Sequence, residues 1–422
     1  MQEIWLKIKG LFKVPMLLVF VIICIAFLPD AVNTPSVVFR TAIVVAFGID
    51  ATEDNQYEIH AAINVSAKDE SLSENTKLMS AVGDSVSQAI TNLSVQFGRA
   101  IRFGHTRFML IGTNLAKQNI AKVLDGVIRT NKMRDTIHLV LCDSDVADML
   151  NVGIEIKNKT GIKLSDIITY QSPNSTVSMD SNIDTFYKGY FSNAGISKIA
   201  CISLTDDYTK GITPEAALGE ATSPQAPDAG NEETGAGKTQ EKKKKFVSSM
   251  GRVGVFKNGI LSQIIDAPIA EGTQWINSSY LPKKLEVDVN NNILDNAQLF
   301  FQVFEKTVSN EVFFYKGIPM LSAKIDVTLG IDEILNGNNN IIPLSQDVVD
   351  QEVKCAIGRK IRTKTAEALK FSRDNNLDIL ELNEIFYLSN YREYIDYLKS
   401  GKSVEDFINE VQVSLEIRVK VI

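Results

Sequence analysis

The sequence predicts an α+β protein whose helices pack on mixed or mostly antiparallel sheets. Some segments repeat apolar residues every three to four positions, as amphipathic helices do, and others alternate apolar with polar residues, as half-buried strands do. The composition is that of a globular protein, with 45% hydrophobic and 23% charged residues. A chain of 422 residues exceeds the size of one ordinary core, so we expect several domains.

We divide the chain into a targeting segment and three domains. The segment covers 1–34, and an amino-terminal α/β domain covers 35–150. A middle domain covers 151–284, and a carboxyl-terminal α/β domain covers 285–422.

The amino-terminal segment has the pattern of a membrane signal. Lys7, Lys9 and Lys13 precede the uncharged apolar run 14–28. As a helix at ~1.5 Å per residue this run spans about 22 Å, whereas a bilayer core is about 30 Å thick. We expect an uncleaved signal anchor, with a cleaved signal peptide or a lipoprotein as alternatives. The basic flank places the body of the protein outside the cytoplasm.

The first domain alternates strands and helices. Gly98 directly follows an apolar helix face, where a left-handed cap is usual. A strand–strand–helix–strand–helix–strand order predicts a mixed α/β layer. The strands are expected at 42–48, 57–66, 107–112 and 136–142, and the helices at 82–97 and 116–128.

The middle domain is expected to contain strands at 196–204 and within 246–265. Between them, the stretch 211–245 has no bulky apolar residue after Leu218 until Phe246. Such a composition cannot bury enough apolar surface to offset its ordering entropy. We therefore expect 211–245 to be a disordered insertion.

The last domain combines strands with two long amphipathic helices. Strands are expected at 285–289, 299–308 and 323–329, and helices at 349–369 and 385–398. Residues 411–421 alternate valine, leucine and isoleucine with polar residues, the clearest period-two run in the chain. We expect an antiparallel sheet with one face on the core and the other facing solvent or a partner.

Two motifs imitate ligand sites without completing them. Thr234–Thr239 resembles the end of a phosphate loop, but Glu232 stands where its first glycine belongs. Asp288 begins a calcium-like spacing in which Ile293 and Leu299 replace the required glycine and glutamate. We therefore expect no nucleotide and no calcium site.

Other chemistry-bearing residues are scattered along the chain. The three histidines share no ligand spacing, and no nucleophile–histidine–acid motif is present. The four cysteines have no zinc spacing and are expected to be buried or tolerated thiols, with their disulfide status open. We expect no cofactor, no metal and no catalysis, and a net charge of −7 argues against nucleic acid as a partner. The cysteines are Cys24, Cys142, Cys201 and Cys355, and the histidines His60, His105 and His138.

The bend between the first helix and the following strand is the most distinctive stretch. His105 is surrounded by Arg99, Arg102 and Arg107. In one interpretation Arg99 and His105 bond to backbone groups and hold the bend; in the other they contact a partner protein.

An ordered set of short motifs resembles the Ger(x)C family, the C-subunits of nutrient germinant receptors in spore-forming bacteria. None of these motifs is specific alone, but their collinear order from about residue 38 to 422 is. The resemblance singles out Gly98, Arg99, Phe103, His105 and Gly112 as structural or partner-contact residues. The motifs are Ala46–Asp50, Ala89–Ser94 with Gly98 and Arg99, Phe103–His105, Ile111–Gly112, Leu115–Lys117, Val255–Phe256, Asn258–Leu261 and Asp378–Ile379.

The resemblance implies a non-enzymatic, membrane-anchored receptor subunit at the spore inner membrane. Its partners would be a multi-span transporter-like subunit and a second membrane subunit, and its role assembly or signal transmission in germination. Whether it binds the nutrient directly is left open. The family usually carries a lipidated cysteine preceded by a small residue, but here Ile23 precedes Cys24, so we expect a helix anchor instead.

Two alternative classes remain. The chain could be an extracytoplasmic small-molecule-binding or sensing protein. It could also be an anchored enzyme that acts on the cell envelope.

Overall fold

The computed structural model describes residues 41–65, 75–131, 133–134, 136–160, 164, 181–206, 246–248, 251–278, 280–290, 294, 296–335 and 350–422. The targeting segment with Cys24 and the insertion 211–245 lie outside these ranges. Within them, no helix combines the length and apolarity needed to cross a bilayer.

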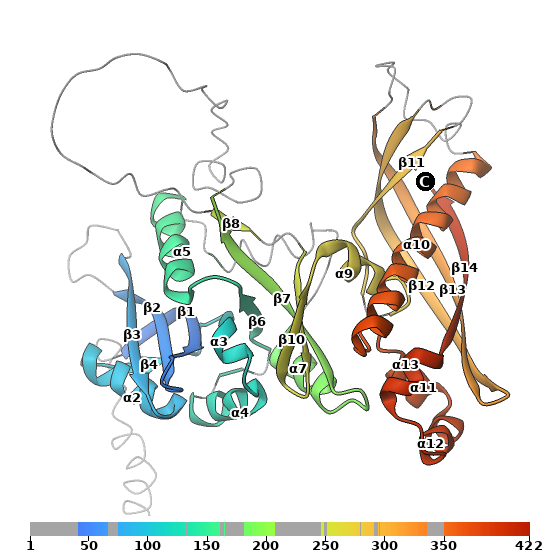
Figure 1. Ribbon diagram of the computed structural model, residues 1–422. Coiled ribbons are helices and arrows are strands. Elements are labelled where there is room, and N and C mark those ends of the chain that lie inside the picture. The colour runs from blue at the N-terminus through green and yellow to red at the C-terminus, as the bar shows by residue number, and fades with distance from the viewer. Residues whose placement is uncertain are drawn as a thin grey trace, which may run out of the picture.

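The predicted α+β class is confirmed, because two mixed sheets are covered by helices (Figure 1). The larger sheet has ten strands in the order β10-β9-β7-β6-β5-β1-β2-β3, with β4 paired to β1 and β8 to β7. Its middle strands β1, β5, β6 and β7 run parallel, and both flanks are antiparallel. The strands are β1 (Thr41–Ala51), β2 (Tyr57–Val65), β3 (Asn75–Gly83), β4 (Ala100–Arg102), β5 (Phe108–Gly112), β6 (His138–Cys142), β7 (Ile196–Thr205), β8 (Phe246–Ser248), β9 (Val253–Lys257) and β10 (Ile260–Ile265).

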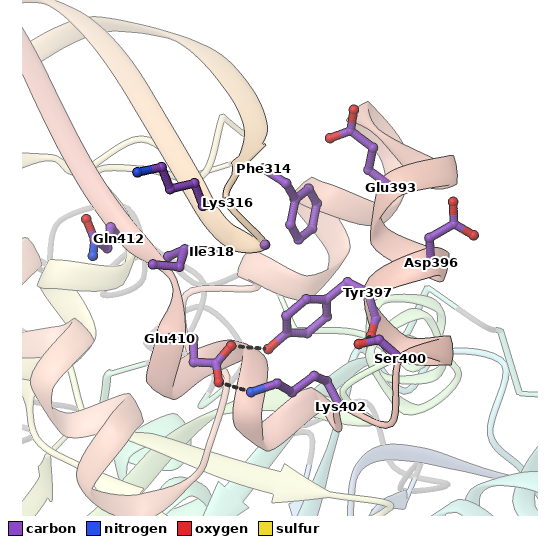
Figure 2. A pocket seen from close by; sticks show the side chains of 11 residues that line it. Phe314, Lys316, Ile318, Glu393, Asp396, Tyr397, Ser400, Lys402, Glu410 and Gln412 are labelled. Atoms are coloured by element: carbon purple, nitrogen blue, oxygen red, sulfur yellow. Dashed lines mark hydrogen bonds and ion pairs between the residues drawn. The ribbon is translucent and has the colours of Figure 1, made fainter.

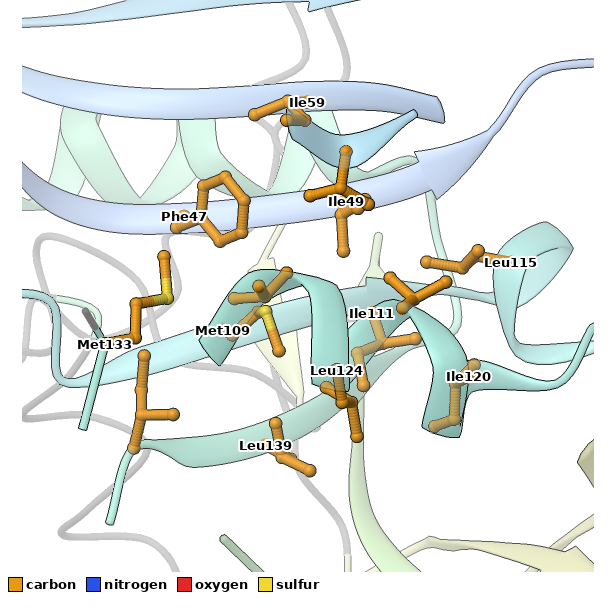
Figure 3. Packing of buried hydrophobic residues seen from close by; sticks show 14 of the residues in the cluster. Phe47, Ile49, Ile59, Met109, Ile111, Leu115, Ile120, Leu124, Met133 and Leu139 are labelled. Atoms are coloured by element: carbon orange, nitrogen blue, oxygen red, sulfur yellow. The ribbon is translucent and has the colours of Figure 1, made fainter. Parts of the chain in front are cut away.

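Helices cover both faces of this sheet. The helices on one face enclose a cluster in which Phe47 and Met109 of the strands meet Leu124 of a helix (Figure 3). On the other face, Met149 and Leu150 pack against the sheet. Because both faces are covered, β5 is buried at every position, as a parallel inner strand is expected to be. The first face carries α2 (Val86–Phe97), α3 (Thr113–Ala116), α4 (Ile120–Asn131) and α7 (Ile183–Tyr190), and the second carries α5 (Val146–Thr160).

The smaller sheet has the order β11-β12-β13-β14. The long helix α10 lies along one of its faces (Figure 1), where Ile357 and Ile361 join the buried cluster. Four shorter helices contribute buried side chains to the cluster that β9 and β13 share. The elements are β11 (Lys284–Val289), β12 (Ala297–Tyr315), β13 (Ile318–Leu335), β14 (Gln412–Val421), α9 (Ala267–Thr273), α10 (Gln351–Asn375), α11 (Leu382–Ser389), α12 (Tyr391–Lys399) and α13 (Val404–Glu410).

One hydrophobic cluster joins the two sheets. Val253 and Val255 of β9 share it with Leu321 and Ala323 of β13 and with Phe386 of α11. The expected domain boundary at 150/151 does not separate two sheets, because β6 pairs with β7 through three residue pairs. The division into three domains stays a prediction, whereas the observed division of strands is into two sheets.

Three expected elements differ in the structure. The first helix was expected from Val82, but Val82 belongs to β3, and α2 begins after Ser85, whose Oγ accepts from the Gln88 N–H at 3.2 Å. The expected helix 385–398 is two helices that meet at Asn390, so its apolar spacing spans a break. The terminal strand β14 pairs with β13 in parallel, so the expected antiparallel neighbour was wrong.

Candidate functional site

The bend singled out in the sequence begins with a helix cap. Gly98 has φ 68°, and its N–H donates to the Val95 carbonyl at 3.2 Å, so the left-handed conformation that glycine favours ends α2. Arg99 is exposed, and its guanidinium carbon lies 5.8 Å from the centre of the Phe97 ring. Arg99 thus lies over its own helix end.

The following residues of the bend point in opposite directions. Phe103 is 4% exposed, and its ring packs edge-on against Phe47 at 5.0 Å between centroids. Thr106 Oγ1 donates to the Val44 carbonyl at 3.1 Å and ties the bend to β1. His105 is exposed. The bend therefore anchors itself through Phe103 and presents His105 to solvent.

Gly112 belongs to a different location, at the far end of β5. A Cβ atom there would lie 2.1 Å from the Asp50 carboxyl carbon. Asp50 Oδ1 accepts from the Leu115 N–H at 2.8 Å. The absent side chain of Gly112 leaves room for this carboxylate, which joins β1 to the segment after β5. The five sequence candidates therefore lie at two locations: Gly98, Arg99, Phe103 and His105 in the bend, and Gly112 at the far end of β5.

A buried ion pair lies where the two sheets meet. Lys198 of β7 has a side chain only 4% exposed, and its Nζ lies 2.5 Å from Glu381 Oε1. The same Nζ donates to the Ile379 carbonyl at 3.2 Å and lies 5.1 Å from the centre of the Tyr280 ring. Burial is the largest single influence and disfavours the charged ammonium, but Glu381, Tyr280 and Asp378 together outweigh it and raise the pKa of Lys198 above its ordinary value. Lys198 is thus a buried cation whose counter-charge, Glu381, lies at the start of α11.

Glu381 is itself held in place. It adopts φ 60°, which is uncommon for a residue with a side chain, at the N-cap of α11, and its Oε2 accepts from Asn277 Nδ2 at 2.6 Å. Beside it, Asp378 accepts from the Leu382 and Asn383 N–H groups at 2.8 Å each. Burial raises the pKa of Asp378. The amide side chain of Asn277 therefore fixes the Glu381 carboxylate, and backbone N–H groups fix that of Asp378 at the start of α11.

A second lysine, Lys306 of β12, binds the segment between α9 and β11 that contains Asn277. Lys306 Nζ of β12 donates to the carbonyls of Gln274 and Asn277 at 2.5 Å each. Burial lowers the pKa of Lys306 to about 8. The segment around Asn277 is thus bonded to both Glu381 and β12. We call Lys198, Glu381, Asn277 and Lys306 the junction.

An open cleft of about 670 Å³ borders the junction. Its walls come from α7 and the start of β7 on one side and from α11 on the other, with Tyr280 and Asn310 between them. Burial, together with Glu381 and Asp378, raises the pKa of Glu384 in this wall. Leu388 is 72% exposed at the cleft. The cleft combines charged, amide and apolar groups, as small-molecule sites do.

A second hollow of about 740 Å³ lies at the turn of the β12–β13 hairpin. In Figure 2, Phe314 and Tyr397 lie next to each other in its wall, with ring centroids 5.6 Å apart, and Tyr397 donates to Glu410 at 2.9 Å. Lys402 also contacts Glu410. Burial raises the pKa of Tyr397. These contacts fasten α12 to α13 beneath the hairpin turn.

None of the junction residues belongs to a site motif that is recognisable in the sequence. A signal was present at Lys198, because it is the one charged residue in the strand-like run 196–204. Asp378 was quoted only for the family resemblance. Within the residues that the structure describes, no three His, Cys, Asp or Glu side chains are grouped to hold a metal ion. Cys142 and Cys201 are free and buried, and Cys355 is free and exposed.

Comparisons with known proteins agree with the sequence resemblance. Residues 38–203 match the family model described as the spore germination protein N-terminal domain. Over 389 residues the chain is 20% identical to Spore germination protein KC of Bacillus subtilis (strain 168), covering 90% of this chain and 87% of that protein. A crystal structure of the GerBC protein aligns at 13% identity with a TM-score of 0.48, covering 90% of this chain and 98% of that one.

Residues 38–203 are thus similar to a spore germination protein N-terminal domain, and the similarity to a spore germination protein continues along most of the chain. Both similarities agree with the resemblance to the Ger(x)C family that the ordered motifs indicated.

Proposed function

We propose that this chain is a non-enzymatic, membrane-anchored subunit of a nutrient germinant receptor that acts in assembly and signal transmission. Its partners in this proposal are a multi-span transporter-like subunit and a second membrane subunit, with the body outside the cytoplasm. The similarity of residues 38–203 to the spore germination N-terminal domain, and of most of the chain to Spore germination protein KC, supports the germination role.

The junction is the observation that carries the transmission part of the proposal. The buried Lys198–Glu381 pair and the shared hydrophobic cluster link the two sheets through side chains. Bodies joined in this way move as one, whereas bodies joined only by a linker do not. A displacement imposed on one sheet by a partner would reach the other.

A membrane pull-down from dormant spores, with this chain as bait, tests assembly. We expect a multi-span membrane protein to be recovered with the wild type. Arg99→Ala and His105→Ala separate the two interpretations of the bend, because both side chains are exposed. Loss of recovery with unchanged thermal stability would assign these residues to partner contact. Failure of the wild type to recover any multi-span protein from intact complexes would contradict the proposal.

Glu381→Gln tests transmission. We expect this variant to assemble with its partners but to slow nutrient-triggered germination, because the two sheets are less firmly joined. Glu286→Gln is a matched control, since Glu286 is exposed on β11 away from the junction. Equal germination rates for both variants and the wild type would contradict transmission through the junction.

A second candidate function is favoured by the cleft. Its 670 Å³ volume and mixed lining would suit a small-molecule sensor. A saturable increase in the Tm of the purified protein with one nutrient, absent in an Asn310→Leu variant, would support direct binding. If no amino acid, sugar or nucleoside raises the Tm, direct nutrient binding at the cleft is contradicted, whereas the receptor-subunit proposal is unaffected.

A further inference from the structure

The edge strand β14 is the surface from which we infer a new interaction. Within the described residues it pairs only with β13, in a parallel register that runs from Met320↔Gln412 to Leu329↔Val421. It contains no proline, and its register with β13 has no bulge. Figure 1 shows it beside β13 at the border of the smaller sheet. A straight edge of this kind is a template for a further strand.

The backbone of β14 determines which residues could pair. The Ile422 N–H donates to the Leu329 carbonyl at 2.9 Å. The backbone N–H and C=O groups of successive residues point to alternate sides of a strand. Those of the even-numbered residues of β14 therefore point toward β13. The N–H and C=O groups of the odd-numbered residues 413–421 point to the free edge. In agreement, Arg362 of α10 reaches the Leu415 carbonyl, at 3.4 Å, a length at which a strand N–H would replace it readily.

The side chains of these residues divide between the two faces. Leu415, Ile417, Val419 and Val421 are only partly buried against the core beneath α10. The intervening residues, from Gln412 to Lys420, are exposed on the opposite face. A further strand would bury the remaining apolar surface on one face and bring charges together on the other.

The order of the exposed charges along β14 indicates which strand would pair with its free edge. In an antiparallel pair of two β14 strands with Ile417 opposite Ile417, Glu416 faces Arg418 twice, and Lys420 faces Ser414. The neighbouring registers that preserve backbone pairing place Arg418 opposite Arg418 or Glu416 opposite Glu416. Like charges directly opposite each other destabilise a sheet. The register centred on Ile417 therefore has two opposite-charge pairs and no like-charge pair. Each neighbouring register has a like-charge pair at its centre, although the one centred on Arg418 also places Glu416 opposite Lys420.

We propose that a second copy of this chain pairs through β14, antiparallel and centred on Ile417. The contact is isologous, with a two-fold axis through Ile417, and joins two four-stranded sheets into one of eight strands. Both α10 helices then lie on the same face. The intrastrand contact of Arg418 Nε with Glu416 Oε1, at 2.9 Å, is exchanged for two contacts across the interface.

The test measures the mass of the full chain in detergent micelles or nanodiscs by sedimentation, from 1 to 100 μM. We expect a dimer for the wild type, at least tenfold weaker association for Arg418→Glu and for Glu416→Arg, and recovery in the double variant E416R/R418E. The single variants place like charges opposite each other, and the double variant restores opposite charges. Recovery also shows that the substitutions leave β14 folded.

Lys420→Glu is the matched control, because it changes the charge by the same amount as Arg418→Glu but faces Ser414. It is expected to associate within about threefold of the wild type. A wild type that stays monomeric at 100 μM would overturn the proposal. Single variants that associate as strongly as the wild type, or a double variant that does not recover, would also overturn it.

Discussion

The two sheets of this protein use their strands in opposite ways. The inner strands of the larger sheet are covered on both faces, and β5 is buried at all five positions. The strand β14 of the smaller sheet alternates exposed and half-buried residues along its whole length. The larger sheet is therefore closed to solvent through its middle, whereas the smaller sheet offers a face and an edge for contact. The larger sheet thus contributes mainly to the buried core, and the smaller sheet contributes an accessible surface.

The largest expected contrast is in thiol chemistry. Burial raises the pKa of Cys142 and of Cys201, both in the larger sheet, to about 12. At that pKa a thiol holds roughly 10³-fold less thiolate than at the ordinary ~8.5. We expect a maleimide to modify exposed Cys355 of α10 at least a thousandfold faster than either buried thiol, measured by mass spectrometry in a Cys24→Ser background. Rapid modification of Cys142 in the native protein would show that the larger sheet opens.

The next effect is loss of packing in the larger sheet. Phe103→Ala removes a ring that is 4% exposed and contacts Phe47. We expect a decrease of about 3–5 kcal/mol in the free energy of unfolding, because a cavity remains. Denaturant titration measures it. A loss below about 1 kcal/mol would mean that the bend is not anchored through Phe103.

Breaking the junction tests the boundary between the sheets. Glu381→Gln leaves the buried ammonium of Lys198 without its counter-charge. Removal of one partner of a buried pair costs about 3–5 kcal/mol, and because Glu381 is 30% exposed we expect roughly 2–3 kcal/mol. Chemical denaturation followed by circular dichroism measures the change. Lys198→Met in the same chain should recover part of the loss, since no buried charge then remains; a further loss would contradict this account.

The smallest effects are expected on the exposed side of the bend. Arg99→Ala and His105→Ala should each change the free energy of unfolding by less than about 0.5 kcal/mol, because surface side chains without buried partners contribute little. Thermal unfolding checks this. A decrease of more than about 1 kcal/mol in the free energy of unfolding of either variant would show that the substituted residue stabilises the bend.

The sequence predicted most of the strands because they carry local periodicity. The continuous apolar runs around Met109 and Leu139 indicated buried strands, and the alternation from Val411 onward indicated an open face. The direction of β14 could not be predicted, because a period of two is the same in parallel and antiparallel pairs. The merging of β7 to β10 into the first sheet is likewise a long-range property.

The candidate site was less predictable than the fold. Gly98, Phe103 and Gly112 were identified through family motifs, and the structure gives each a local reason. The junction joins Lys198 to Glu381 across more than 180 positions, and Lys306 to backbone carbonyls that leave no mark in the sequence. A lone lysine in an apolar strand indicates that a counter-charge exists, but not where it lies.

The parallel pairing of β14 also has a consequence for how the protein is made. Met320 and Gln412 are register partners about 90 residues apart, so the smaller sheet cannot be completed until the residues after 411 have emerged. Contacts at such separation form slowly, and β13 waits with an unpaired edge in the meantime. A chain threaded across a membrane from its amino-terminal end would therefore fold its larger sheet first. During that interval, the exposed border of β13 would be where a chaperone is most needed.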